Sequence, residues 1–259
     1  MQSFDGKIVL VTGASSGIGK AAAIMLAQRG AHVIAAARRV AESEATVEAI
    51  RQVGGEATFV AMDVSDGDSV AAGFDQIRSR FGRLDAAYNN AGVTNDFKLL
   101  GDMTDEDVRS LLEINLYGHI QCMRHELAIM QPQKAGVILN TGSTASLAGA
   151  GHLAVYAATK HGIIGLTKSA ALDYAAQGIR VNCLCPGGVK TEIAAAAIER
   201  DPSLEAFIAK KVPLQRMAEP SEIAEVACFL LSDAASFMTG SVVLADGGQT
   251  VGFSVAPQE

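Results

Sequence analysis

The sequence has no apolar run long enough to cross a membrane and no tract of basic residues. A membrane-spanning helix needs roughly 18 or more consecutive apolar residues. The net charge is -7, from 21 Lys and Arg against 28 Asp and Glu. Because nucleic acids and anionic membrane surfaces attract clustered positive charge, we expect no nucleic acid and no membrane among the partners.

Targeting signals, cysteine bridges and metal clusters are also missing. The opening residues, MQSFDGKIVLVTG, hold no charged region followed by a long apolar stretch, so we expect no secretory signal. Alternation along a strand is expected to place Cys183 and Cys185 on opposite sides, without a bridge. Reduced thiols suit a cytoplasmic protein. No set of His, Cys, Asp and Glu has metal-ligand spacing, so we predict no metal.

Short apolar runs alternate with longer helical patterns along the whole chain. The runs that predict strands are 7–12, 31–36, 57–62, 84–89, 136–141, 179–184 and 241–245. The patterns that predict helices are 17–29, 41–53, 65–81, 104–130, 155–177 and 221–231. This alternation predicts an α/β protein with a parallel sheet and helices on both faces. No linker or repeat divides the sequence, so we expect one domain over 1–259.

The segment 189–215 interrupts this alternation, because it follows a strand but holds an alanine-rich helical stretch. A long insertion at the carboxyl end of a strand is a typical position for a lid over substrate. The alternative is a pair of surface helices that only covers the core.

A glycine-rich turn follows the first predicted strand and leads into a helix. Gly13, Gly17 and Gly19 form the pattern G-x-x-x-G-x-G, with Ser15, Ser16 and Ile18 between them. Glycines let the backbone approach a pyrophosphate, and the helix amino terminus faces its charge. The pattern therefore predicts a nucleotide site, although a glycine-rich turn without a ligand remains an alternative.

The end of the second predicted strand indicates which nucleotide is bound. An acidic residue there would hold the adenosine ribose of NAD. The sequence instead places Arg38 and Arg39 after three alanines. A guanidinium can hold the 2′-phosphate through its planar fork, so we predict a preference for NADP(H) over NAD(H). The alternative is that both arginines begin a solvated helix.

Two further strand ends are expected to meet the same nucleotide. Asp63 and Val64 end the third strand, where the carboxylate can reach an adenine amine. Asn90, Ala91 and Gly92 follow the fourth, and their small size lets the backbone approach the ribose. Doubly wound sheets bind ligands at this edge.

A tyrosine and a lysine four residues apart predict acid–base chemistry. Tyr156 and Lys160 lie on one face of a predicted helix, where the ammonium is expected to lower the phenol pKa. Such a phenol can act as a general acid or base near neutral pH. Ser143 upstream offers a hydroxyl to hold a carbonyl oxygen. Taken singly, each residue could instead be an ordinary surface or turn residue.

Together these motifs resemble the short-chain dehydrogenase/reductase family. The resemblance runs from about residue 5 to residue 250 and rests on the order and spacing of Thr12-Gly13-x-x-x-Gly17-x-Gly19, Asn89-Asn90-Ala91-Gly92, Asn115, Ser143, Tyr156-x-x-x-Lys160 and Pro186-Gly187. It implies a single doubly wound, Rossmann-type domain with a seven-stranded sheet, a nicotinamide cofactor and a homotetramer.

The resemblance also implies the catalytic roles. Tyr156 would give a proton to the carbonyl oxygen as hydride reaches the carbon, and Ser143 would position that oxygen. Lys160 would hold the nicotinamide ribose, and Asn115 would hold a water that connects the lysine to a proton relay. All four residues are therefore predicted to form the catalytic group.

The same resemblance places further residues against the nicotinamide. The backbone of Pro186 and Gly187 would face the ring. Val189, through its backbone, and Thr191 would bond the carboxamide. Tyr156 and Lys160 would contact the cofactor as well.

The substrate is expected to be a hydrophobic ketone or secondary alcohol. The predicted walls are mostly small or apolar, and apolar walls around a catalytic hydroxyl suit such molecules. They comprise residues 143–153, the Thr94–Asn95 loop, Ile193, Ile198 and Phe207. Two alternatives are a 3-oxoacyl-thioester reductase of fatty-acid synthesis and a nucleotide-sensing scaffold without catalysis.

Overall fold

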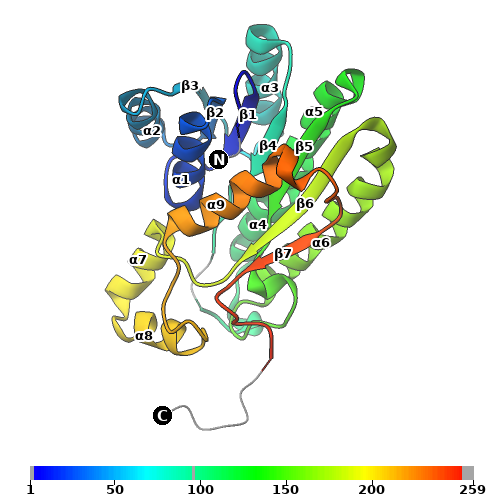
Figure 1. The fold of residues 1–259 in the computed structure, drawn as a ribbon. Coiled ribbons are helices and arrows are strands. Elements are labelled where there is room, and N and C mark those ends of the chain that lie inside the picture. Colours follow the sequence, from blue (N-terminus) through cyan, green and yellow to red (C-terminus); the bar gives the residue numbers. More distant parts are fainter. Residues whose placement is uncertain (1–2, 95–96, 253–259) are drawn as a thin grey trace.

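The computed structural model describes residues 3–94 and 97–252 (Figure 1). Within them, seven strands form one parallel sheet in the order β3-β2-β1-β4-β5-β6-β7. The strands are β1 Ile8–Thr12, β2 His32–Ala37, β3 Glu56–Ala61, β4 Ala86–Asn89, β5 Gly136–Thr141, β6 Ile179–Pro186 and β7 Val242–Ala245. The predicted seven-stranded, doubly wound α/β fold is therefore confirmed.

Helices cover both faces of the sheet. They are α1 Gly17–Gln28, α2 Val40–Gln52, α3 Gly67–Phe81, α4 Asp105–Leu112, α5 Gly118–Gln133, α6 Ala154–Tyr174, α7 Glu192–Arg200, α8 Ser203–Lys210 and α9 Pro220–Leu231. Buried residues of α1, α2 and α9 form one apolar cluster, and those of α3, α5 and α6 form a second. Figure 1 shows α1 and α9 lying together on one side of the strands.

Strand β1 shows why the sheet is buried on both sides. Val9, Leu10 and Val11 are all fully buried. Because successive side chains point to opposite faces, Val9 and Val11 join the cluster with α1 and α9, while Leu10 joins the cluster with α3 and α5. A continuous apolar run is what a parallel strand between two helix layers requires.

The predicted helix 104–130 is interrupted. The capping box of Thr104 and Asp107 starts α4 as expected, but a π-helical turn over Glu113–Tyr117 separates α4 from α5. One extra residue in a helical turn hardly changes the spacing of apolar residues, so the sequence pattern did not predict this π-helical turn. Such π-turns are frequent at functional sites, and this one carries Asn115.

The strand order reverses between β1 and β4, so their carboxyl ends open a crevice. The segment 189–215, expected to hold one helical stretch, contains the two helices α7 and α8 instead. It leaves the sheet after β6. Helix α8 packs against the backbone of Gly188, because a Cβ on Gly188 would lie 2.5 Å from Ile208 Cγ2. The segment therefore packs beside the crevice rather than away from it.

The expectation for the cysteine pair on β6 is wrong. Cys183 and Cys185 share one face, and their sulfurs lie 3.7 Å apart. The physical reason is the two-residue period of a strand, which puts residues i and i+2 on the same side. Both thiols are buried and unbridged, as are Cys122 and Cys228, and all four lie in the described part of the chain.

Among the described residues, no helix combines the length and the apolar character that crossing a membrane requires.

Candidate active site

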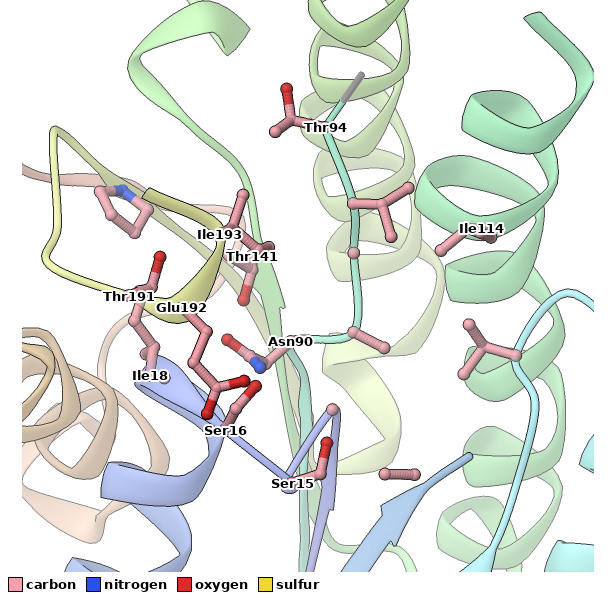
Figure 2. A pocket seen from close by; sticks show the side chains of 18 of the residues that line it. Ser15, Ser16, Ile18, Asn90, Thr94, Ile114, Thr141, Thr191, Glu192 and Ile193 are labelled. Atoms are coloured by element: carbon pink, nitrogen blue, oxygen red, sulfur yellow. The ribbon is translucent and has the colours of Figure 1, made fainter. Parts of the chain in front are cut away.

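A cavity of about 580 Å³ lies at the carboxyl ends of the strands. Its volume is within the range of ligand sites. Every residue predicted for catalysis or cofactor binding lines it except Gly19 and Asn115. Residues from six strand ends and from the start of α7 thus meet in one place (Figure 2).

The glycine-rich turn has the backbone shape that its sequence predicts. Gly13 and Gly17 have φ of 68° and 53°, a region that side chains disfavour. Gly19 serves packing rather than the cavity wall, because a Cβ there would lie 2.3 Å from the carbonyl oxygen of Gly13. At Gly13 and Gly17, the turn therefore lines the cavity with backbone and no side chain.

Thr12 ties this turn to the end of β4. Its Oγ1 accepts hydrogen bonds from the amides of Asn90 and Ala91, both at 3.1 Å. The side-chain amide of Asn90 in turn donates to the carbonyl of Thr12 at 3.3 Å. A Cβ on Gly92 would lie 3.7 Å from Lys160 Nζ, so this small-residue turn reaches from the glycine turn to Lys160.

The two arginines at the end of β2 have different partners. Arg39 donates to Ser15 Oγ from Nε at 3.3 Å and from Nη2 at 3.0 Å. Arg38 lies 3.6 Å from the carboxylate of Asp63. Burial raises the pKa of Asp63, but hydrogen bonds from Ser65 and the charge of Arg38 outweigh it, so the net shift is downward. Asp63 is therefore an anion that orients Arg38.

Lys160 is a buried cation beside the tyrosine. Its Nζ donates to the carbonyl of Thr141 at 2.8 Å and lies 5.8 Å from the ring centroid of Tyr156. Burial lowers the pKa of Lys160 to about 8. The ammonium is thus held by β5, within reach of the ring but not bonded to it.

The expected lowering of the Tyr156 pKa is not what the structure shows. Burial raises this pKa, and a hydrogen bond with Ser143 opposes the rise only in part. The cause is burial, which outweighs both the hydrogen bond with Ser143 and the ammonium of Lys160, whose Nζ donates to Thr141. Ser143 is itself held by its amide, which donates to Ser146 Oγ at 3.0 Å, so its hydroxyl stays beside the phenol.

Asn115 lies just behind the cavity wall. Its Oδ1 accepts from the amide of Val93 and its Nδ2 donates to the carbonyl of Val93, each at 2.8 Å. Both polar atoms of the Asn115 side chain are therefore bonded to the backbone of Val93. Its contact with a relay water stays a prediction.

The end of β6 closes the cavity on the α7 side. The amide of Gly187 donates to the carbonyl of Ala245 at 3.1 Å, which fixes the turn after Pro186. Val189 forms a parallel bridge with Ala218, and Thr191 caps α7. Pro186, Gly187, Val189 and Thr191 thus line the cavity, and their contact with the nicotinamide stays a prediction.

Sequence reasoning missed a buried carboxylic acid behind the site. Glu126 is fully buried, and burial raises its pKa to about 8. Asn89 Nδ2 donates to Glu126 Oε2 at 3.1 Å and to Asn140 Oδ1 at 3.2 Å, and Asn140 donates to Thr167 Oγ1 at 3.0 Å. This network anchors the end of β4. The sequence could have indicated this buried acid, because Glu126 lies on the apolar face of the predicted helix 104–130.

The predicted substrate walls are partly wrong. Ser143, Thr94 and Ile193 line the cavity, whereas residues 144–153, Ile198 and Phe207 do not. Asn95 lies outside the described residues. Val93 and Ile114 add apolar surface that was not predicted. Within the described ranges, no three His, Cys, Asp or Glu residues could hold a metal ion.

The backbone and side chains of this cavity fit a dinucleotide. The glycine-rich turn at the start of α1 lines the cavity, where a helix amino terminus suits a pyrophosphate, and two guanidinium groups lie at one end. A phenol, a hydroxyl and a buried ammonium lie at the other. This separation places charge recognition and proton chemistry at opposite ends of one elongated ligand.

Comparison with known proteins agrees with this arrangement. The sequence model of a family described as enoyl-(acyl carrier protein) reductase matches residues 13–250. The chain is 39% identical to a 3beta-hydroxysteroid dehydrogenase of Mediterraneibacter gnavus, over 96% of this chain and 97% of that protein. It is 37% identical to a cyclohexanol dehydrogenase of Acinetobacter sp., over 95% of this chain and 96% of the relative.

Solved structures show the same similarity. Levodione reductase superposes with a TM-score of 0.92 at 34% identity, covering 96% of this chain and 100% of that one. The full-length match in sequence and fold, and the convergence of the motif residues on one cavity, agree with each other. The chain belongs to the short-chain dehydrogenase/reductase family and is an oxidoreductase that uses a nicotinamide cofactor.

Proposed function

We propose that the protein transfers hydride between NADP(H) and a hydrophobic ketone or secondary alcohol. The observation that carries this proposal is the meeting of Tyr156, Ser143 and Lys160 at one end of the cavity. The nicotinamide supplies or accepts the hydride. In reduction, the Tyr156 hydroxyl gives its proton to the carbonyl oxygen, and Ser143 holds that oxygen in place. The Lys160 ammonium stabilises the phenolate that remains.

The apolar wall supports a hydrophobic substrate. Val93, Ile114 and Ile193 line the cavity with apolar side chains. Relatives are named for cyclohexanol and 3beta-hydroxysteroid substrates, both of which are alicyclic alcohols. Apolar walls with few polar groups select such molecules.

A substrate screen tests this proposal. With NADPH and NADP⁺, we expect turnover of cyclic ketones and alcohols at least tenfold above that of polyols, because the walls offer sugars few hydrogen-bond partners. The measurement is nicotinamide absorbance, with product chirality recorded. Exclusive turnover of sugars would reject the hydrophobic substrate class.

A 3-oxoacyl thioester belongs in the same screen. The matched family model is described as an enoyl-(acyl carrier protein) reductase, so reduction of the 3-oxo group of a carrier-bound acyl thioester is the second candidate activity. The relatives' names favour ketone and alcohol substrates instead. Faster reduction of an acetoacetyl thioester than of any cyclic ketone would favour the second candidate.

The two guanidinium groups support NADP(H). Arg38→Asp is expected to reduce the preference for NADP(H) over NAD(H) by about one to two orders of magnitude. It replaces a cation that donates hydrogen bonds to the 2′-phosphate by an anion that repels this phosphate. The measurement is the ratio of kcat/KM for the two cofactors. An unchanged ratio would remove Arg38 from cofactor selection.

We also infer that the chain forms one domain and a homotetramer, and that 189–215 acts as a lid. The lid is supported by the position of α7 beside the cavity. The tetramer is supported by exposed apolar side chains on the outer helices, such as Tyr117 and Leu172, which is 85% exposed.

A further inference from the structure

An acidic side chain occupies the arginine corner of the cavity. Glu192, the first residue of α7, accepts a hydrogen bond from Arg39 Nη1 at 3.1 Å. The same guanidinium donates to Ser15 Oγ through its other two nitrogens. Figure 2 shows the Glu192 side chain directed toward the turn that carries Ser15 and Ser16. Arg39 is thus held between the glycine turn and α7.

The start of α7 places Glu192 beside the nucleotide turn. Thr191 caps the helix by accepting from the amide of Ala194 at 3.3 Å. Gly17 lets Thr191 come close, because a Cβ on Gly17 would lie 3.2 Å from Thr191 Cγ2. The first residue after the cap therefore lies beside the nucleotide turn, and its carboxylate meets the nearest cation, Arg39.

Glu192 and a 2′-phosphate would need the same donors. A phosphate carries about 1.5 to 2 negative charges and accepts two parallel hydrogen bonds from a guanidinium, which makes it the stronger ligand. The carboxylate of Glu192 is 61% exposed, so the present ion pair is weakly held. When the phosphate takes the Arg39 fork, the carboxylate must leave or face a like charge.

We propose that Glu192 is a specificity-determining residue: it competes with the cofactor's 2′-phosphate for Arg39 and so weakens discrimination in favour of NADP(H). This role rests on the proposed nucleotide site. Helix α7 would then take part in cofactor selection, in addition to its proposed role in the lid over the substrate.

The test compares two adenosine nucleotides that differ by the phosphate alone. Calorimetry at low salt measures the Kd of 2′,5′-ADP and of 5′-AMP, so no turnover is needed. We expect Glu192→Gln to tighten 2′,5′-ADP about 1.5-fold to fivefold, the range for one exposed charge interaction, and to change 5′-AMP much less. Glu199→Gln is the matched control, since it removes an exposed carboxylate two turns along the same helix.

A double-mutant cycle separates competition from simple repulsion. With Arg39→Ala in place, Glu192→Gln should no longer change the ratio of the two Kd values. An equal change with and without Arg39, or no change in the wild-type background, would overturn the proposal. The wild-type ratio alone tests the NADP(H) preference, so a ratio that favours 5′-AMP rejects that preference while leaving the Glu192 comparison valid.

Discussion

Tyr156→Phe is expected to lower turnover by about three orders of magnitude, within the range that a general acid contributes. The substitution keeps the ring and removes the only proton that the half-buried phenol can give to a carbonyl oxygen. Ser143 cannot replace it, because an aliphatic hydroxyl is a much weaker acid than a phenol. The measurement is kcat for the best ketone in the screen.

Cofactor binding separates this chemical effect from a folding effect. The Kd of NADPH for Tyr156→Phe, measured by fluorescence, should stay within a few-fold of the wild-type value. Tyr174→Phe, at the other end of α6, is the matched control and should retain full turnover. A Tyr156→Phe enzyme that keeps a tenth or more of the wild-type kcat would show that another group donates the proton.

Lys160→Met should lower kcat/KM by about two to three orders of magnitude, as expected when one buried electrostatic contact is removed. Methionine has a similar length and no charge, so it leaves the phenolate of Tyr156 without a cation. It also leaves the carbonyl of Thr141 without its donor. Lys168→Met, an exposed lysine two turns along α6, is the control and should change little.

The pH profile distinguishes the charge of Lys160 from its packing. Burial lowers the pKa of Lys160 to about 8, so the ammonium is present below this pH and is lost as the pH rises through it. In the wild type, kcat/KM should therefore fall above about pH 8, since kcat/KM reports the free enzyme. The variant should lack this decline. A decline of equal size in Lys160→Met would assign it to another group.

Local spacing explains why part of the active site was predictable. The four-residue interval between Tyr156 and Lys160 is one helical turn, so a single helix aligns them without help from the rest of the fold. The glycine-rich turn is similar, because its backbone angles are set within a few residues. Strand ends could be assigned to one edge of the sheet because parallel strands all point the same way, so that their carboxyl ends lie together.

Errors arose where the outcome depends on burial or on partners far along the chain. The direction of the Tyr156 pKa shift follows from burial, which outweighs the hydrogen bond with Ser143. The contact of Arg39 with Glu192 joins residues 153 positions apart. The cysteine error was different: the period of the strand was available in the sequence and was misapplied.

The order of strands and helices, the family and the chemical types in the cavity were determined by the sequence alone, because periodicity, turn residues and helical spacing act over a few residues. The bonding state of each polar group was decided only by the tertiary structure. Whether a charge is buried, and which carbonyl or carboxylate lies within 3 Å of it, depends on how α5, α6 and α7 pack against strand ends that are distant in the sequence.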